Sequence, residues 1–119
     1  NVVNNNILRT ETSRIIVGAS DVEDDIEDMT LTVQHRISSG DWTDTYFDQS
    51  WYNSSSDKWE TNFTPPTSAV LGDYDVRIMV NDTDGASTGW STYSDAITVN
   101  NNNPLLSNYG LSSSSILRT

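Results

Sequence analysis

The chain has 119 residues, with 17 acidic and 6 basic side chains, a formal net charge of −11 and no cysteine. A chain of this length buries one hydrophobic core on folding, which predicts a single soluble domain. The few Lys and Arg residues exclude binding of nucleic acid or of an anionic membrane surface by charge neutralisation, and without cysteine there is no disulfide or thiolate chemistry. The absence of a long apolar run predicts no membrane span. Because the first residue is Asn1 and not methionine, we expect a processed or excised piece of a larger protein.

Alternation of apolar and polar residues is the dominant pattern, and no segment has the 3.6-residue apolar stripe of an amphipathic helix. In chain order, the alternation predicts strands at 15–19, 29–37, 42–47, 51–52, 59–63, 74–80 and 96–99. The clearest is 74–80, where Tyr74, Val76, Ile78 and Val80 share one face. Short strands separated by loops rich in Ser, Asp, Gly and Pro favour an all-β Greek-key sandwich of about seven strands over a βαβ fold.

Several segments carry a family resemblance: 17–28, 59–66, the sequence LGDY at 71–74, 80–85 and the sequence ITVNNNNP at 97–104. In these segments the chain resembles the tandem immunoglobulin-like repeats of archaeal and bacterial cell-surface proteins, close to PKD, cadherin-like and fibronectin type III sandwiches. The LGDY sequence is similar to a tyrosine corner, in which the hydroxyl of Tyr74 would tie the start of a strand to a nearby connection. The resemblance implies an immunoglobulin-like β-sandwich in an extracellular location at the cell surface.

The sequence ILRT at residues 7–10 recurs at residues 116–119, an offset of 109 residues. A weaker echo relates residues 2–6 to residues 98–102. Self-similarity at a domain-sized period is typical of arrays of like modules, although biased composition can produce a short match by chance. We therefore divide the chain into the end of a preceding linker or an N-terminal arm (1–6), an immunoglobulin-like domain (7–103), and the first strand of the next repeat or a donor strand for a neighbouring subunit (104–119).

The segment 104–119 contains six apolar residues without an evident partner in the domain, namely Leu105, Leu106, Tyr109, Leu111, Ile116 and Leu117. One hypothesis makes it the first strand of a covalently linked downstream domain. Another makes it a strand that inserts into a sheet edge of a neighbouring copy, because residues 1–6 are too few to supply the domain's own first strand. A third makes it a disordered polar tail.

Six carboxylates fall within residues 21–28. In a sandwich of this class the loops after the second and the sixth strand lie at the same end, which would bring the acidic residues after position 81 toward this cluster. Oxygen ligands from two loops suit Ca²⁺, and cadherin-like resemblance supports the same cofactor. The predicted ligands are Asp21, Glu23, Asp24, Asp25, Asp82 and Asp84. An acidic surface that maintains solubility explains the same residues without a metal.

The aromatic residues suggest an alternative function. Trp42, Trp51 and Trp90 lie close to loops, and if exposed they would form a platform for sugar stacking in a carbohydrate-binding module. Trp59 instead shares its side of a strand with Phe63, as a core residue would.

The sequence contains few patterns that indicate glycosylation or catalysis. Asn53, Asn62 and Asn81 each begin an N-glycosylation pattern, of which Asn53 is the most credible because it lies in a loop. His35 is the only histidine, and its alternation with Val33 predicts a packed residue and not a general base. We therefore expect no enzyme, but a structural or adhesive module that repeats along a filament, stalk or layer with neighbouring copies of itself as partners, and with surface glycans or other cells as targets.

Overall fold

The computed structural model describes residues 2–20 and 24–103. Within these ranges the chain forms seven strands and one short 3₁₀ helix: β1 (Asn6–Leu8), β2 (Ser13–Val17), η1 (Ile26–Asp28), β3 (Thr30–Ile37), β4 (Trp51–Asn53), β5 (Lys58–Phe63), β6 (Gly72–Asn81) and β7 (Ser91–Asn100). The fold is therefore all-β, as the alternation of apolar and polar residues predicts. No helix in the described ranges is long and apolar enough to cross a membrane.

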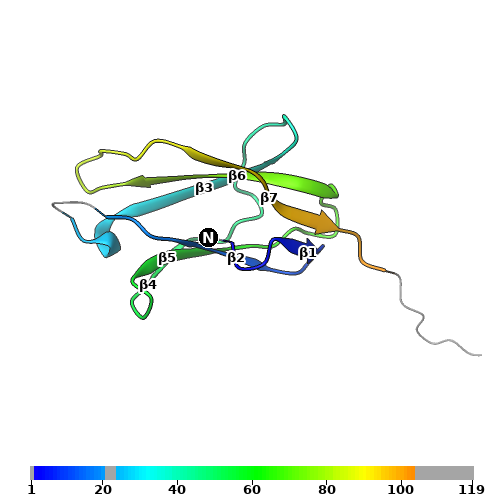
Figure 1. The fold of residues 1–119 in the computed structure, drawn as a ribbon, viewed down its shortest axis with the longest axis horizontal. Coiled ribbons are helices and arrows are strands. Elements are labelled where there is room, and N and C mark those ends of the chain that lie inside the picture. The colour runs from blue at the N-terminus through cyan, green and yellow to red at the C-terminus, as the bar shows by residue number, and fades with distance from the viewer. Residues whose placement is uncertain (1, 21–23, 104–119) are drawn as a thin grey trace, which may run out of the picture.

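The strands form two sheets, which appear as two layers in Figure 1. One has the order β1-β7-β6-β3 and the other the order β2-β5-β4. All neighbouring strands are antiparallel except β1 and β7, which run parallel. The longest ladder joins β3 to β6 without a break, from the pair Thr30 and Asn81 to the pair Ile37 and Tyr74.

One hydrophobic core lies between the two sheets. Ile15 of β2 and Phe63 of β5 are fully buried, and they belong to the same cluster as Val33 of β3 and Val76 of β6. Alternate residues of β3 are buried, because successive side chains of a strand point to opposite faces of its sheet. The arrangement is that of a β-sandwich, with the predicted apolar faces turned inward.

Most predicted strands are present with small shifts of their ends, but the strand predicted at 42–47 is wrong. Only isolated bridges occur there, from Thr43 to His35 and from Phe47 to Phe63. Between them the backbone turns, and the N–H of Phe47 donates to the carbonyl oxygen of Asp44 at 2.9 Å. The strand predicted at 96–99 is present but begins earlier, at Ser91. Residues 91–95 are exposed and carry no apolar alternation, so the sequence pattern does not indicate that they belong to the strand.

Two side chains near the start of β6, those of Tyr74 and Asp75, make hydrogen bonds to neighbouring segments. The hydroxyl of Tyr74 donates to the carbonyl oxygen of Val70 at 2.7 Å, the bond that a tyrosine corner requires. At the next residue the β6–β7 register shifts, and the carboxylate of Asp75 accepts hydrogen bonds from the N–H of Asp95 at 2.9 Å and from Arg36 at 3.1 Å. The bond from the Asp95 backbone, followed by that from Arg36, lowers the pKa of Asp75.

Candidate functional site

Three carboxylates from two loops meet at one end of the domain. Asp24 precedes η1, whereas Asp82 and Asp84 follow β6, and one oxygen from each lies within 4.8 Å of the others. Both loops lie at the end of the sandwich opposite the point where β7 ends (Figure 1). The prediction that these loops share one end is confirmed. Asp25 is exposed and is not one of the three, and Asp21 and Glu23 lie outside the described residues.

Hydrogen bonds within the loops hold this acidic cluster. One oxygen of Asp24 accepts bonds from the backbone N–H and the hydroxyl of Thr83, at 3.3 and 3.0 Å. One oxygen of Asp82 accepts from the N–H groups of Asp84 and Ala86, at 2.9 and 2.8 Å. These bonds bring the carboxylates together without requiring a cation, so the calcium site stays a prediction.

We expect Ca²⁺ at about 1 mM to raise the melting temperature by a few degrees, because a cation that binds only the folded state adds to the free energy of unfolding. Asp82→Asn together with Asp84→Asn should remove this response, and Asp41→Asn together with Asp48→Asn in another loop should keep it. The measurement is differential scanning calorimetry with Ca²⁺ and with chelator. Equal midpoints in the two conditions would contradict a calcium site.

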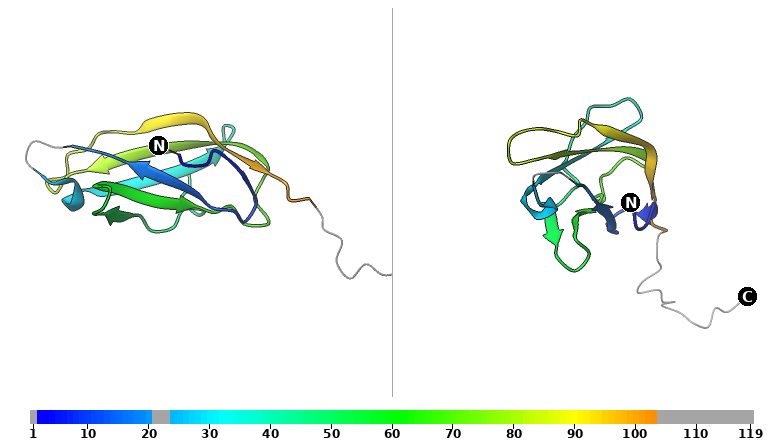
Figure 2. Two further views of the ribbon diagram at one scale, coloured as in Figure 1. Left: turned by 60° about the horizontal axis from the view of Figure 1, so that its bottom comes forward. Right: turned by 60° about the vertical axis from the view of Figure 1, so that its left-hand side comes forward.

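The edge of the four-stranded sheet next to β7 is occupied by the domain's own β1. Ile7 lies opposite Val99 and is only 1% exposed, and Leu8 lies opposite Asn100. Figure 2 shows β1 beside the final part of β7. The domain therefore has a first strand of its own, but this strand lies at 6–8 and takes only Asn6 from the segment 1–6 that was expected to be too short to supply it. The predicted assembly strand itself, residues 104–119, lies outside the described residues.

The tryptophans proposed as a sugar platform are each stacked with arginine. The guanidinium carbon of Arg36 lies 4.3 Å from the ring centre of Trp42. The same atom of Arg77 lies 4.6 Å from the ring of Trp42 and 4.0 Å from the ring of Trp90. Such cation–π contacts stabilise exposed rings by about 0.5–1 kcal/mol each. A sugar stacking on these faces would have to displace the guanidinium groups.

Trp51 lies on the other sheet, in β4, where Arg14 of β2 stacks on it at 5.3 Å. The three tryptophans therefore do not form one continuous platform. Trp59 packs against the core and donates its indole N–H to the carbonyl oxygen of Ile26 at 2.7 Å, as its predicted core position implies.

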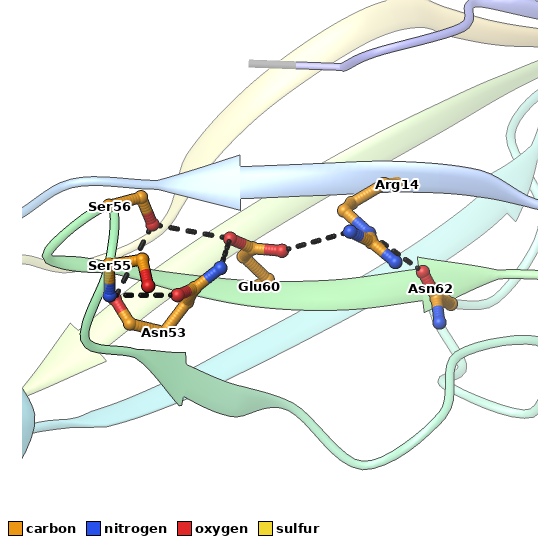
Figure 3. A network of polar contacts seen from close by, with 6 residues as sticks. All are labelled: Arg14, Asn53, Ser55, Ser56, Glu60 and Asn62. Carbon is orange, nitrogen blue, oxygen red and sulfur yellow. Dashed lines mark hydrogen bonds and ion pairs between the residues drawn. The ribbon is translucent and has the colours of Figure 1, made fainter.

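A polar network covers the outer face of the three-stranded sheet (Figure 3). Its centre is Glu60 in β5, which is only 3% exposed. The Glu60 carboxylate accepts hydrogen bonds from Asn53 at 2.7 Å and from Ser56 at 3.3 Å, and its other oxygen lies 3.4 Å from a guanidinium nitrogen of Arg14. Arg14 also donates to Asn62 at 3.3 Å. The network joins all three strands of this sheet through one buried carboxylate.

Arg14→Met should lower the free energy of unfolding by about 1–3 kcal/mol, because it leaves the buried Glu60 carboxylate without its cation. Adding Glu60→Gln to this variant should restore part of the loss, since the charge that needed a partner is then gone. Urea denaturation of the two single variants and the double variant gives the coupling energy. Lys58→Met, at an exposed position of the same strand, is the control, and additive effects of the two network substitutions would contradict the coupling.

The predicted glycosylation residues differ in how their side chains are engaged. The amide nitrogen of Asn53 donates to Glu60, and its carbonyl oxygen accepts a bond from the N–H of Ser55 at 3.0 Å. The amide oxygen of Asn62 accepts the bond from Arg14. Asn81 lies at the end of β6, half-buried. Glycosylation at these positions stays a prediction.

His35 is a core residue, as its alternation predicts. Its ring is 2% exposed and stacks on Tyr46 at 4.5 Å, and its Nε2 accepts a hydrogen bond from the N–H of Tyr46 at 3.1 Å. The rings of Phe63 and Tyr74 contact it edge-on at 5.3 and 5.8 Å. Burial lowers the pKa of His35 to about 4, so the ring is neutral at pH 7. These contacts account for His35 as a packed, uncharged side chain.

Comparison with known proteins adds no relative: neither a scan against protein-family models nor searches of the curated proteins and the solved structures found a match.

Proposed function

We propose that this chain is an immunoglobulin-like module of an extracellular surface structure, and that copies of it follow one another along a filament, stalk or layer. The observation that carries the proposal is the relative direction of the first and the last strand of the domain. β1 runs parallel to β7, so the chain enters and leaves in the same direction. Modules with this geometry can be joined head to tail in an open row.

The strand pairing supports the immunoglobulin-like Greek-key part of the proposal. In such domains the second strand pairs with the fifth and the fifth with the fourth, while the third, sixth and seventh share the other sheet. The orders β2-β5-β4 and β7-β6-β3 match this arrangement. The hydrogen bond from the Tyr74 hydroxyl to Val70 is a second feature of the same class.

The ends of the domain support a row of copies. The recurrence of ILRT at 7–10 and 116–119 is expected if each copy is followed by the start of another, covalently or through a donated strand. The acidic cluster of Asp24, Asp82 and Asp84 lies at the end away from the exit of β7, and in a row it would face the preceding copy. A cation bound there would stiffen the junction between copies.

Electron microscopy of native material tests this function. The expected result is a row of particles with an axial repeat of one domain length. In solution, the full chain should form larger species by sedimentation velocity if the connection is non-covalent, and deletion of residues 105–119 should abolish them. Native material that contains only separate globular particles would contradict the proposal.

A further inference from the structure

An open groove runs along one side of the domain, between β2 and the first half of β7. It consists of two pockets with volumes of 340 and 310 Å³, which share Ile78 and Tyr93 as lining residues. One pocket also contacts Val76 and the other Val80, so the two follow one another along β6. Each is many times larger than the ~30 Å³ that a water molecule takes in the liquid.

The groove is open because β1 covers only the last part of β7. β1 pairs with residues 98–100, and from Ser91 to Ala96 no strand within 2–20 or 24–103 pairs with β7 on this side. Apolar surface is uncovered as a result. Ile78 is only half-buried, although Val76 and Val80 on the same face of β6 are 1% and 6% exposed, and Tyr93 is 54% exposed. The edge of β7 from Ser91 to Ala96 therefore has room for one more strand.

We propose that residues 104–119 of a second copy of this chain fill the groove, as an added strand beside β7. This inference rests on the proposed function and names the surface through which successive copies meet. An added strand satisfies the backbone groups of a sheet edge, and alternate side chains enter the pockets below it. Residues 104–117 supply suitable side chains, because six of them are apolar and none is charged.

Charge favours this occupant over other segments of the chain. All 17 acidic residues lie before position 104, so any other face of a second copy would bring carboxylates toward a domain that is itself strongly acidic. Of the residues that line the two pockets, only Asp95 is charged. A segment without carboxylate side chains can enter this groove without repulsion. Its ionisable side chains are those of Tyr109 and Arg118.

The segment is also long enough for the open edge. Residues 104–115 are the twelve residues that precede the second ILRT. Fully extended, twelve residues span roughly 40 Å, which exceeds the roughly 20 Å of open edge between Ser91 and Ala96. The segment is long enough to cover the groove and to leave a connection between the two copies.

Because the chain has no cysteine, a disulfide between two single-cysteine variants can test the contact. Full-length Tyr93→Cys and Leu111→Cys proteins are mixed under mild oxidation, and disulfide-linked heterodimers are measured by non-reducing electrophoresis and mass spectrometry. Docking raises the local concentration of the two thiols, so we expect a yield about tenfold or more above that of the control pair Ser55→Cys and Leu111→Cys. Ser55 is exposed in the β4–β5 turn and does not line either pocket of the groove.

Equal yields for the two pairs would overturn the inference. A chain that carries both Tyr93→Cys and Leu111→Cys, and that forms only an internal disulfide at every concentration, would overturn it too, because the occupant would then be the chain's own segment. Regular rows in native material together with equal cross-linking yields would reject the groove and leave the proposed function standing. Melting temperatures equal to that of the parent chain establish that each variant is folded.

Discussion

Phe63→Ala is expected to lower the free energy of unfolding by about 3–5 kcal/mol, the usual loss for a buried aromatic residue. Phe63 is fully buried, and its ring lies 5.2 Å from Phe47 and 5.6 Å from Tyr74 in edge-on contacts. The Ala variant therefore loses apolar burial and ring contacts together, and it leaves a cavity between the sheets. Since domains of this size are stable by only about 5–15 kcal/mol, the variant should be largely destabilised.

Urea denaturation followed by tryptophan fluorescence measures this effect, with Val70→Ala at an exposed apolar position as the control. Val70 is 57% exposed, so truncation of its side chain should change the free energy of unfolding by no more than about 0.5 kcal/mol. If Phe63→Ala were as mild as Val70→Ala, the burial of Phe63 would not contribute to the stability of the core.

Acid should destabilise the domain through His35. Burial lowers the pKa of His35 from 6.5 to about 4, and the nearby carboxylate of Asp44 offsets only part of this effect. Between pH 6.5 and pH 4 the unfolded chain binds a proton that the folded domain does not. The free energy of unfolding should therefore fall by about 3 kcal/mol as the pH falls through this window, and His35 should contribute no further change above it.

His35→Gln should remove this slope while keeping an acceptor for the N–H of Tyr46. The measurement is the difference between the stability curves of the parent chain and the variant from pH 7.5 to pH 4, which cancels the titration of the carboxylates that both share. Asp75, whose pKa is lowered, loses its contribution at more acidic pH than this window. Parallel curves would show that His35 does not titrate differently in the folded and unfolded chains.

Alternation of apolar and polar residues predicted the strands that bury one face. It did not predict strand segments that lack this alternation. Val76 and Val80 lie on the buried face that the sequence indicates. The strand predicted at 42–47 fails because its aromatic residues pack against arginine and against the core from a turn, where burial needs no ladder. β1 is only three residues long and pairs in parallel with a strand at the other end of the chain, which no local pattern reveals.

The candidate sites divide in a similar way. The meeting of Asp24 with Asp82 follows from a rule about which loops share an end, so the sequence could predict it. The Glu60 network and the stacked arginines were missed, because they depend on which residues face each other across strands. In the sheet, Arg14 lies opposite Asn62, and Glu60 lies opposite Trp51. These pairs can be identified only when the register of the strands is known. The sequence does give one indication for Glu60. Positions 60 and 63 are three residues apart in one strand, so the side chain of Glu60 points away from the core face that Phe63 occupies.

The parallel pairing of β1 with β7 also determines how the domain would respond to tension. If the two ends of the chain are pulled apart, β1 and β7 are drawn past each other along their length. The bonds between them, from the N–H of Thr98 to Asn5 at 2.8 Å and from the N–H of Arg9 to Asn100 at 3.1 Å, then carry the load together and do not open one after another. A tether between such modules would extend at its connections before its domains unravel.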